Sequence, residues 1–135
     1  MAFPTTRELI SKAESELGTR LPAALVDHLQ RKNGGVVTVM EEGWRLFPVF
    51  DASDQSRAKR TAGHVIAENK SARSWAGFPS AAVAIAASDY GDYLVLLPNP
   101  HRTGELGEAL QRWDHETGEL LPVEESLEAA LATAI

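Results

Sequence analysis

The chain has 135 residues, of which 44% are apolar and 24% are charged. These proportions are typical of a globular protein with one core, and they exclude a disordered or fibrous chain. No apolar run reaches the roughly 18 residues of a membrane helix, and the N-terminus lacks the blocks of a signal peptide. The absence of cysteine removes disulfides, thiolate metal sites and cysteine nucleophiles. We expect a single domain over residues 1–135, located in the cytoplasm and not associated with a membrane.

Charge is unevenly divided along the chain. Residues 1–75 carry 11 lysines and arginines against 9 acidic residues, whereas residues 76–135 carry 2 against 10. An acidic half disfavours binding to nucleic acid, whose phosphates attract cationic surfaces. It is compatible with a basic protein partner, which acidic side chains would steer and orient. The simpler interpretation, that the acidic excess only aids solubility, stays open.

Two helices are predicted at the N-terminal end. Residues 5–8 have the spacing of a capping box, and apolar residues then recur at helical spacing until Gly18, which tolerates a left-handed backbone. Pro22 suits the first turn of a second helix because its missing N–H costs nothing there. That helix carries a leucine stripe and ends at residues 33–35, Asn-Gly-Gly. The short linker requires the two helices to lie near each other.

Three hairpins are predicted from apolar runs that flank short acidic turns containing glycine. Pro48 places its own strand at a sheet edge or ends it, because proline cannot donate to a strand ladder. The paired runs are expected at residues 36–40 and 44–50, 81–87 and 93–97, and 109–113 and 119–123.

Two more helices complete the prediction. The polar residues 51–60 predict a loop that leads into a third helix, and Ser126 is expected to cap a last one. The fold class is therefore α+β, a mainly antiparallel sheet of about six strands with helices packed on it. The apolar face of the third helix is expected to hold Ala62, Val65, Ile66, Asn69 and Ala72.

Catalytic and metal-binding patterns are weak. The four histidines are His28, His64, His101 and His115. None has the spacing that places two imidazoles on one helix face, and His28 is expected to be solvent-facing or half-buried. His115 with Asp114 and Glu116 is the most metal-like group, but three adjacent residues converge poorly on one ion. No nucleophile elbow or phosphate loop is present. We predict no catalytic, metal or cofactor-binding residues, with a small hydrolase or metal-dependent enzyme as the alternative.

Aromatic and acidic residues coincide at two predicted turns. Most aromatic side chains are expected to pack the sheet, but Tyr90 and Trp113 stand beside acidic turns and are expected to be half-exposed. Interfaces draw on such residues, and nearby carboxylates would suit a basic partner. The predicted partner contacts are Asp89, Tyr90, Asp92, Asp114 and Glu116.

Several of these segments together resemble one family. Residues 17–22, Leu-Gly-x-x-Leu-Pro, and residues 33–35 look like the opening of the SUKH superfamily, typified by the yeast cell-wall synthesis regulator. Residues 87–96 resemble its second signature, in which a small-residue strand turns through Gly-Asp into an apolar strand. Residues 111–116 resemble the third, a strand that ends in Trp-Asp-His-Glu, and residues 126–131 match the closing helix.

The resemblance implies an α+β domain without known catalysis that acts by binding other proteins. Many bacterial members are similar to immunity proteins, which neutralise secreted toxins that are often nucleases. Such nucleases tend to be basic because they bind phosphates, so an acidic inhibitor is physically reasonable. We expect an immunity-type protein whose partner is a basic toxin domain. We expect it to bind neither nucleic acid nor a membrane. The alternative within the family is a regulatory scaffold that binds host proteins.

Overall fold

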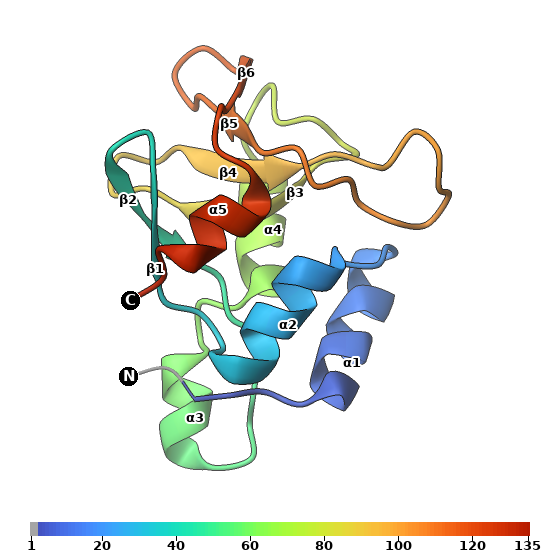
Figure 1. Ribbon diagram of the computed structural model, residues 1–135, viewed down its shortest axis with the longest axis vertical. Helices are drawn as coiled ribbons and strands as arrows, with labels where there is room; N and C mark the ends of the chain where they lie inside the picture. Colours follow the sequence, from blue (N-terminus) through green and yellow to red (C-terminus); the bar gives the residue numbers. More distant parts are fainter. Residues whose placement is uncertain (1–2) are drawn as a thin grey trace.

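A computed structural model describes residues 3–135 as five helices and a six-stranded sheet (Figure 1). The helices are α1 (Arg7–Leu17), α2 (Ala23–Arg31), α3 (Gln55–Arg60), α4 (Val65–Arg73) and α5 (Leu127–Ala132). The strands are β1 (Val36–Val39), β2 (Glu42–Leu46), β3 (Val83–Ala87), β4 (Tyr93–Leu96), β5 (Gln111–Trp113) and β6 (Leu120–Pro122). Neighbours in the sheet follow chain order, and every pairing is antiparallel. The predicted α+β fold, with its sheet of about six strands and its two N-terminal helices, is confirmed.

Polar groups join the two N-terminal helices at their ends. The Thr6 hydroxyl accepts a hydrogen bond from the backbone N–H of Leu9 at 3.2 Å and caps α1. Gly18 ends α1 with φ 77°, a left-handed conformation that glycine adopts without steric cost. The buried carboxylate of Glu14 accepts from the N–H of Leu21 at 2.8 Å, just before α2. This bond fixes where the second helix begins.

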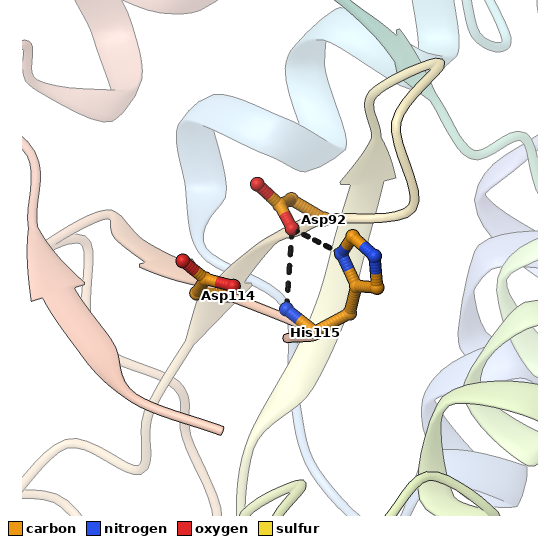
Figure 2. A group of neighbouring side chains, drawn as sticks. All are labelled: Asp92, Asp114 and His115. Atoms are coloured by element: carbon orange, nitrogen blue, oxygen red, sulfur yellow. Dashed lines mark hydrogen bonds and ion pairs between the residues drawn. The ribbon is translucent and has the colours of Figure 1, made fainter. Parts of the chain in front are cut away.

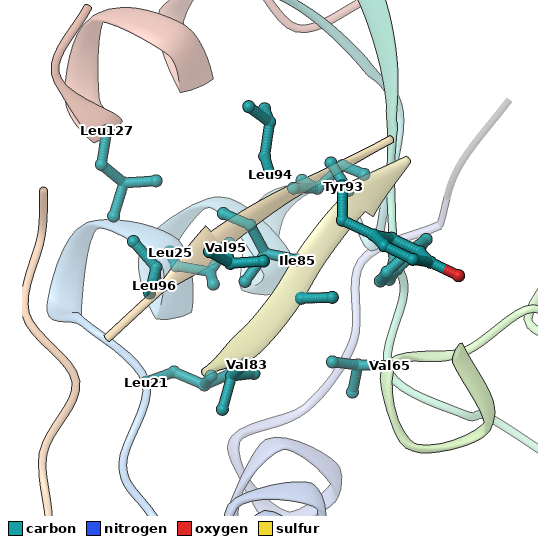
Figure 3. Packing of buried hydrophobic residues seen from close by; sticks show 14 of the residues in the cluster. Leu21, Leu25, Val65, Val83, Ile85, Tyr93, Leu94, Val95, Leu96 and Leu127 are labelled. Atoms are coloured by element: carbon teal, nitrogen blue, oxygen red, sulfur yellow. The ribbon is translucent and has the colours of Figure 1, made fainter. Parts of the chain in front are cut away.

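The core lies around the central hairpin of β3 and β4 (Figure 3). All four residues of β4 and the first four of β3 are buried, so both faces of these strands are covered. Leu25 of α2 and Leu127 of α5 pack into the same cluster as Val65 of α4. Each such side chain contributes about 1.5–3 kcal/mol when it is fully buried. The continuous apolar runs in the sequence reflect this two-sided burial.

A buried asparagine continues the sheet where β2 no longer pairs. The Asn69 side chain on α4 donates to the carbonyl of Ala84 and accepts from its N–H, both at 2.8 Å. Beside it, the register of β3 against β4 shifts between Ala84 and Ala86. The amide thus satisfies one donor and one acceptor that would otherwise be buried and unpaired.

The prediction of a loop over residues 51–60 is wrong in its second half. Asp54 accepts from the N–H of Arg57 at 2.8 Å and caps α3, a short helix that buries no residue. The next helix begins at Val65, so Ala62 lies outside it. Pro48 follows the end of β2, and β2 is an inner strand that pairs with both β1 and β3.

Across residues 3–135, none of the helices combines the length and the apolar character needed to cross a membrane.

Candidate functional site

The turn between β3 and β4 presents Tyr90 to solvent. The Ser88 hydroxyl accepts from the N–H groups of Tyr90 at 3.2 Å and Asp92 at 3.3 Å. Gly91 adopts φ 96°, which an L-residue rarely does. These contacts fix the turn from inside, and the Tyr90 side chain is 75% exposed at its tip.

The turn between β5 and β6 is organised by Asp114. Its carboxylate accepts from the N–H groups of Glu116 at 2.8 Å and Thr117 at 3.4 Å, and its carbonyl accepts from Gly118 at 2.7 Å. This is the pattern by which aspartate imitates a backbone turn. Glu116 is exposed, whereas Asp114 is only partly exposed. Asp114 therefore shapes the turn as well as contributing charge.

Asp92 connects the two turns. One carboxylate oxygen accepts from the backbone N–H of His115 at 3.1 Å and lies 2.6 Å from its ring Nδ1 (Figure 2). The other accepts from Arg112 Nη2 at 2.6 Å and Nε at 3.0 Å. Asp92 is only 5% exposed. The residue was predicted to contact a partner, but its carboxylate is directed inward and holds the two turns together.

Arg112 extends this connection to the first hairpin. Its guanidinium lies 3.3 Å from the carboxylate of Glu42 at the start of β2 and 5.1 Å from the ring centre of Trp44. A cation over the face of an indole ring is attracted by the ring's quadrupole. One side chain on β5 thus contacts residues of both other hairpins.

The charges of this cluster favour its ionised form. Burial by itself would raise the pKa of Asp92, but hydrogen bonds from His115 and Arg112 outweigh it and hold the pKa below its usual value. The hydrogen bond to Asp92 raises the pKa of His115 above its ordinary value of 6.5. The two pKa shifts are opposite in sign and both favour the charged form of their group, as expected for an aspartate paired with a histidine.

The cluster has some features of a metal site or a catalytic dyad. Ligand-type atoms of Asp92, Asp114 and His115 lie within 4.8 Å of one another. However, Arg112 already occupies one oxygen of Asp92, and its positive charge would repel a metal ion. Within residues 3–135, the His115 ring has its hydrogen bond to Asp92 and none to a serine or threonine hydroxyl. The arrangement is therefore that of a structural ion pair.

Two aromatic residues differ from the sequence prediction. Trp113, expected to be half-exposed, is fully buried, and its indole N–H donates to the carbonyl of Gly77 at 3.3 Å. Trp75, which follows α4, is 45% exposed, and its ring centre lies 5.8 Å from that of His115. Sequence reasoning missed Trp75 because its exposure depends on where the end of α4 meets the β5–β6 turn.

Side chains at these two turns, together with Trp75 after α4, form one surface, which we call the turn patch. It joins the exposed aromatic residues to the acidic residues of both turns, with His115 between them. Its members are Trp75, Asp89, Tyr90, Asp114, His115 and Glu116.

His28 belongs to the fold rather than to the surface, contrary to prediction. It is 6% exposed, and its Nε2 lies 2.9 Å from the carbonyl oxygen of Gly34. This contact ties α2 to the glycine pair that follows it.

The chain was compared with known protein families and with individual curated proteins. No curated protein matches the chain. The family model described as SMI1 / KNR4 family (SUKH-1) matches residues 4–133, which include every helix and strand of the fold. The chain therefore belongs to the SMI1/KNR4 family (SUKH-1), in agreement with the resemblance drawn from its motifs.

Proposed function

We propose that this protein is a non-catalytic protein-binding module of the immunity type, which neutralises a basic toxin domain by binding it with the turn patch. Two observations carry the proposal. Tyr90 is exposed on a turn that Asp92 joins to the β5–β6 turn, and the exposed Trp75 has its ring centre 5.8 Å from that of His115 on the β5–β6 turn. Aromatic side chains on a rigid base lose little conformational entropy on binding, which makes them effective anchors at interfaces.

The charge around these aromatic residues supports a basic partner. Asp89 and Glu116 are exposed beside them, and residues 76–135 carry 10 acidic residues against 2 basic ones. Acidic groups at the rim of an interface mainly increase the association rate and orient the partner. A toxin that binds nucleic acid would present the complementary cationic surface.

Co-expression with the product of the neighbouring gene tests the proposal. Growth rescue and co-purification of the two proteins are the expected results. Replacing Tyr90 and Trp75 with alanine should weaken the complex by about tenfold or more each, which is the range for interface anchors. Failure to bind or rescue against any co-encoded toxin would contradict the toxin assignment.

A matched variant separates the turn patch from the rest of the surface. Phe50 is 42% exposed and does not belong to the patch, so F50A removes an exposed aromatic ring elsewhere. F50A should leave rescue unchanged. Equal losses in F50A and Y90A would place the binding surface elsewhere. Co-purification with host proteins instead of a toxin would favour the regulatory scaffold.

A further inference from the structure

A second surface of the molecule is cationic. A cavity of about 600 Å³ lies between α3, the turn that follows α2, and the end of β2. In Figure 1, α3 lies at the end of the long axis opposite β5 and β6. Four basic side chains from three parts of the chain line this cavity, which we call the arginine groove. They are Lys32, Arg45, Arg57 and Arg60.

The one acidic side chain among the lining residues is already used within the fold. Asp51 is 5% exposed, and its carboxylate accepts from the N–H of Ser53 at 2.9 Å. Hydrogen bonds from Ser53 hold the pKa of Asp51 below its usual value, so it stays ionised. The lining holds four basic side chains against this one acidic side chain.

Two of the cations are held by the same aromatic ring. The guanidinium carbons of Arg57 and Arg60 each lie 4.8 Å from the ring centre of Phe3. Stacking uses the face of a guanidinium, whose N–H donors lie in the plane of the group. The Nε of Arg57 is buried without a hydrogen-bond partner, and the nearest carboxylate oxygen, on Asp54, is 4.0 Å away. A buried donor left unpaired is unfavourable, and an anion in the groove would relieve it.

Arg45 approaches from the β2 side. Its Nη2 lies 3.1 Å from Glu68, which does not line the groove, so this ion pair positions the guanidinium without filling the cavity. At Gly63, a Cβ atom would lie 3.2 Å from Arg45 Nη1. The glycine thus makes room for the guanidinium against the loop between α3 and α4.

We propose that the arginine groove binds a small organic molecule that carries a phosphate or diphosphate group. Three guanidinium groups and one ammonium suit an anion of charge −2 or more, and guanidinium forks match phosphate oxygens geometrically. The volume lies within the range of small-molecule sites. Val36, Leu46 and Pro48 give part of the wall an apolar surface for the rest of the ligand. This site is independent of the turn patch.

Isothermal titration of the full chain with sodium pyrophosphate and with ADP tests the proposal. Binding of both is expected, with ADP tighter because the apolar wall contacts its nucleoside. Equal affinities would still support the phosphate site, with the free anion as ligand. If neither pyrophosphate nor ADP gives a heat of binding at up to about 5 mM, where even weak sites are detectable, the proposal is overturned. So would binding of a polyglutamate peptide in their place, since an acidic protein segment would then be the ligand.

Substitutions on one helix give the matched control. R57Q and R60Q should each weaken pyrophosphate binding by about tenfold or more, since a hydrogen bond to a charged group is lost. Lys59 is exposed on α3 but does not line the groove, so K59Q should bind like the unmodified chain. Equal effects of K59Q and R60Q would mean unspecific attraction and would overturn the proposal. If α3 variants unfold, K32Q with R45Q tests the same groove from its other walls.

Discussion

The turn patch and the arginine groove use charge in opposite ways. At the turns, Asp92 and Arg112 pair with each other in a largely buried position, and the result is a rigid base for exposed side chains. At the groove, Arg45 and Arg57 pair with Glu68 and Asp54, neither of which lines the cavity, and four basic side chains line it against one acidic side chain. A buried ion pair stabilises a shape, whereas basic side chains that line a cavity suit an anionic ligand.

The largest expected effect comes from removing the carboxylate that joins the turns. D92A should lower the free energy of unfolding by about 2–3 kcal/mol, because Arg112 and His115 lose their partner in a partly buried place. Urea unfolding measures it. The neighbouring variant D89A, which removes an exposed carboxylate, should change stability by about 0.5 kcal/mol or less. Similar losses of unfolding free energy in D92A and D89A would show that the buried carboxylate contributes no more to stability than the exposed one.

A smaller loss is expected from G91A. The backbone φ of 96° is unfavourable for alanine, and the new Cβ would lie 3.3 Å from the His115 ring. We expect a loss of about 1–2 kcal/mol in the same urea experiment, together with altered chemical shifts of His115. The matched variant G104A has a similar φ of 81° but meets no atom within 4 Å. A larger loss in G104A would contradict the steric part of this argument.

Stability should also depend on pH through His115. Because its pKa is raised in the folded state, its contribution is fully present below the unfolded value near 6.5 and is lost as pH rises through the higher folded value. Unfolding free energies measured from pH 6 to pH 9 should therefore fall more in the unmodified chain than in H115Q. The loss should be smaller than in D92A, since Arg112 keeps its carboxylate. Parallel pH profiles of the two proteins would show that the pair does not contribute.

The smallest stability change is expected at the groove. R57Q combined with R60Q removes two positive charges, yet the unfolding free energy should change by about 1 kcal/mol or less, because exposed ion pairs and cation–π contacts are weak. Urea unfolding without phosphate measures this. A loss as large as that of D92A would show that these arginines serve the fold and not a ligand.

Much of the fold could be predicted from local signals. Glycine and proline indicated the ends of the first two helices, and apolar runs around acidic turns that contain glycine predicted the three hairpins. Helix α3 escaped prediction because it buries no residue and therefore has no apolar periodicity. Its visible signal was the cap residue Asp54.

The sites were harder to predict because they depend on contacts between distant residues. Asp92 is buried by Arg112 and His115, which follow it in the sequence by 20 and 23 positions. A sequence places Asp92 in an acidic turn but does not indicate which carboxylate is turned inward. The arginine groove is assembled from residues between 3 and 135, and no single segment of it resembles a phosphate-binding motif.

The position of Arg112 has a consequence for how the molecule opens. Because its side chain contacts Glu42, Trp44 and Asp92, β5 cannot separate from β4 without also loosening the first hairpin. Amide protons of the three hairpins should then exchange with solvent as one cooperative unit and not hairpin by hairpin. A sheet whose strands follow chain order would otherwise fray from its β6 edge, and this one arginine ties β5, the strand next to that edge, to β2.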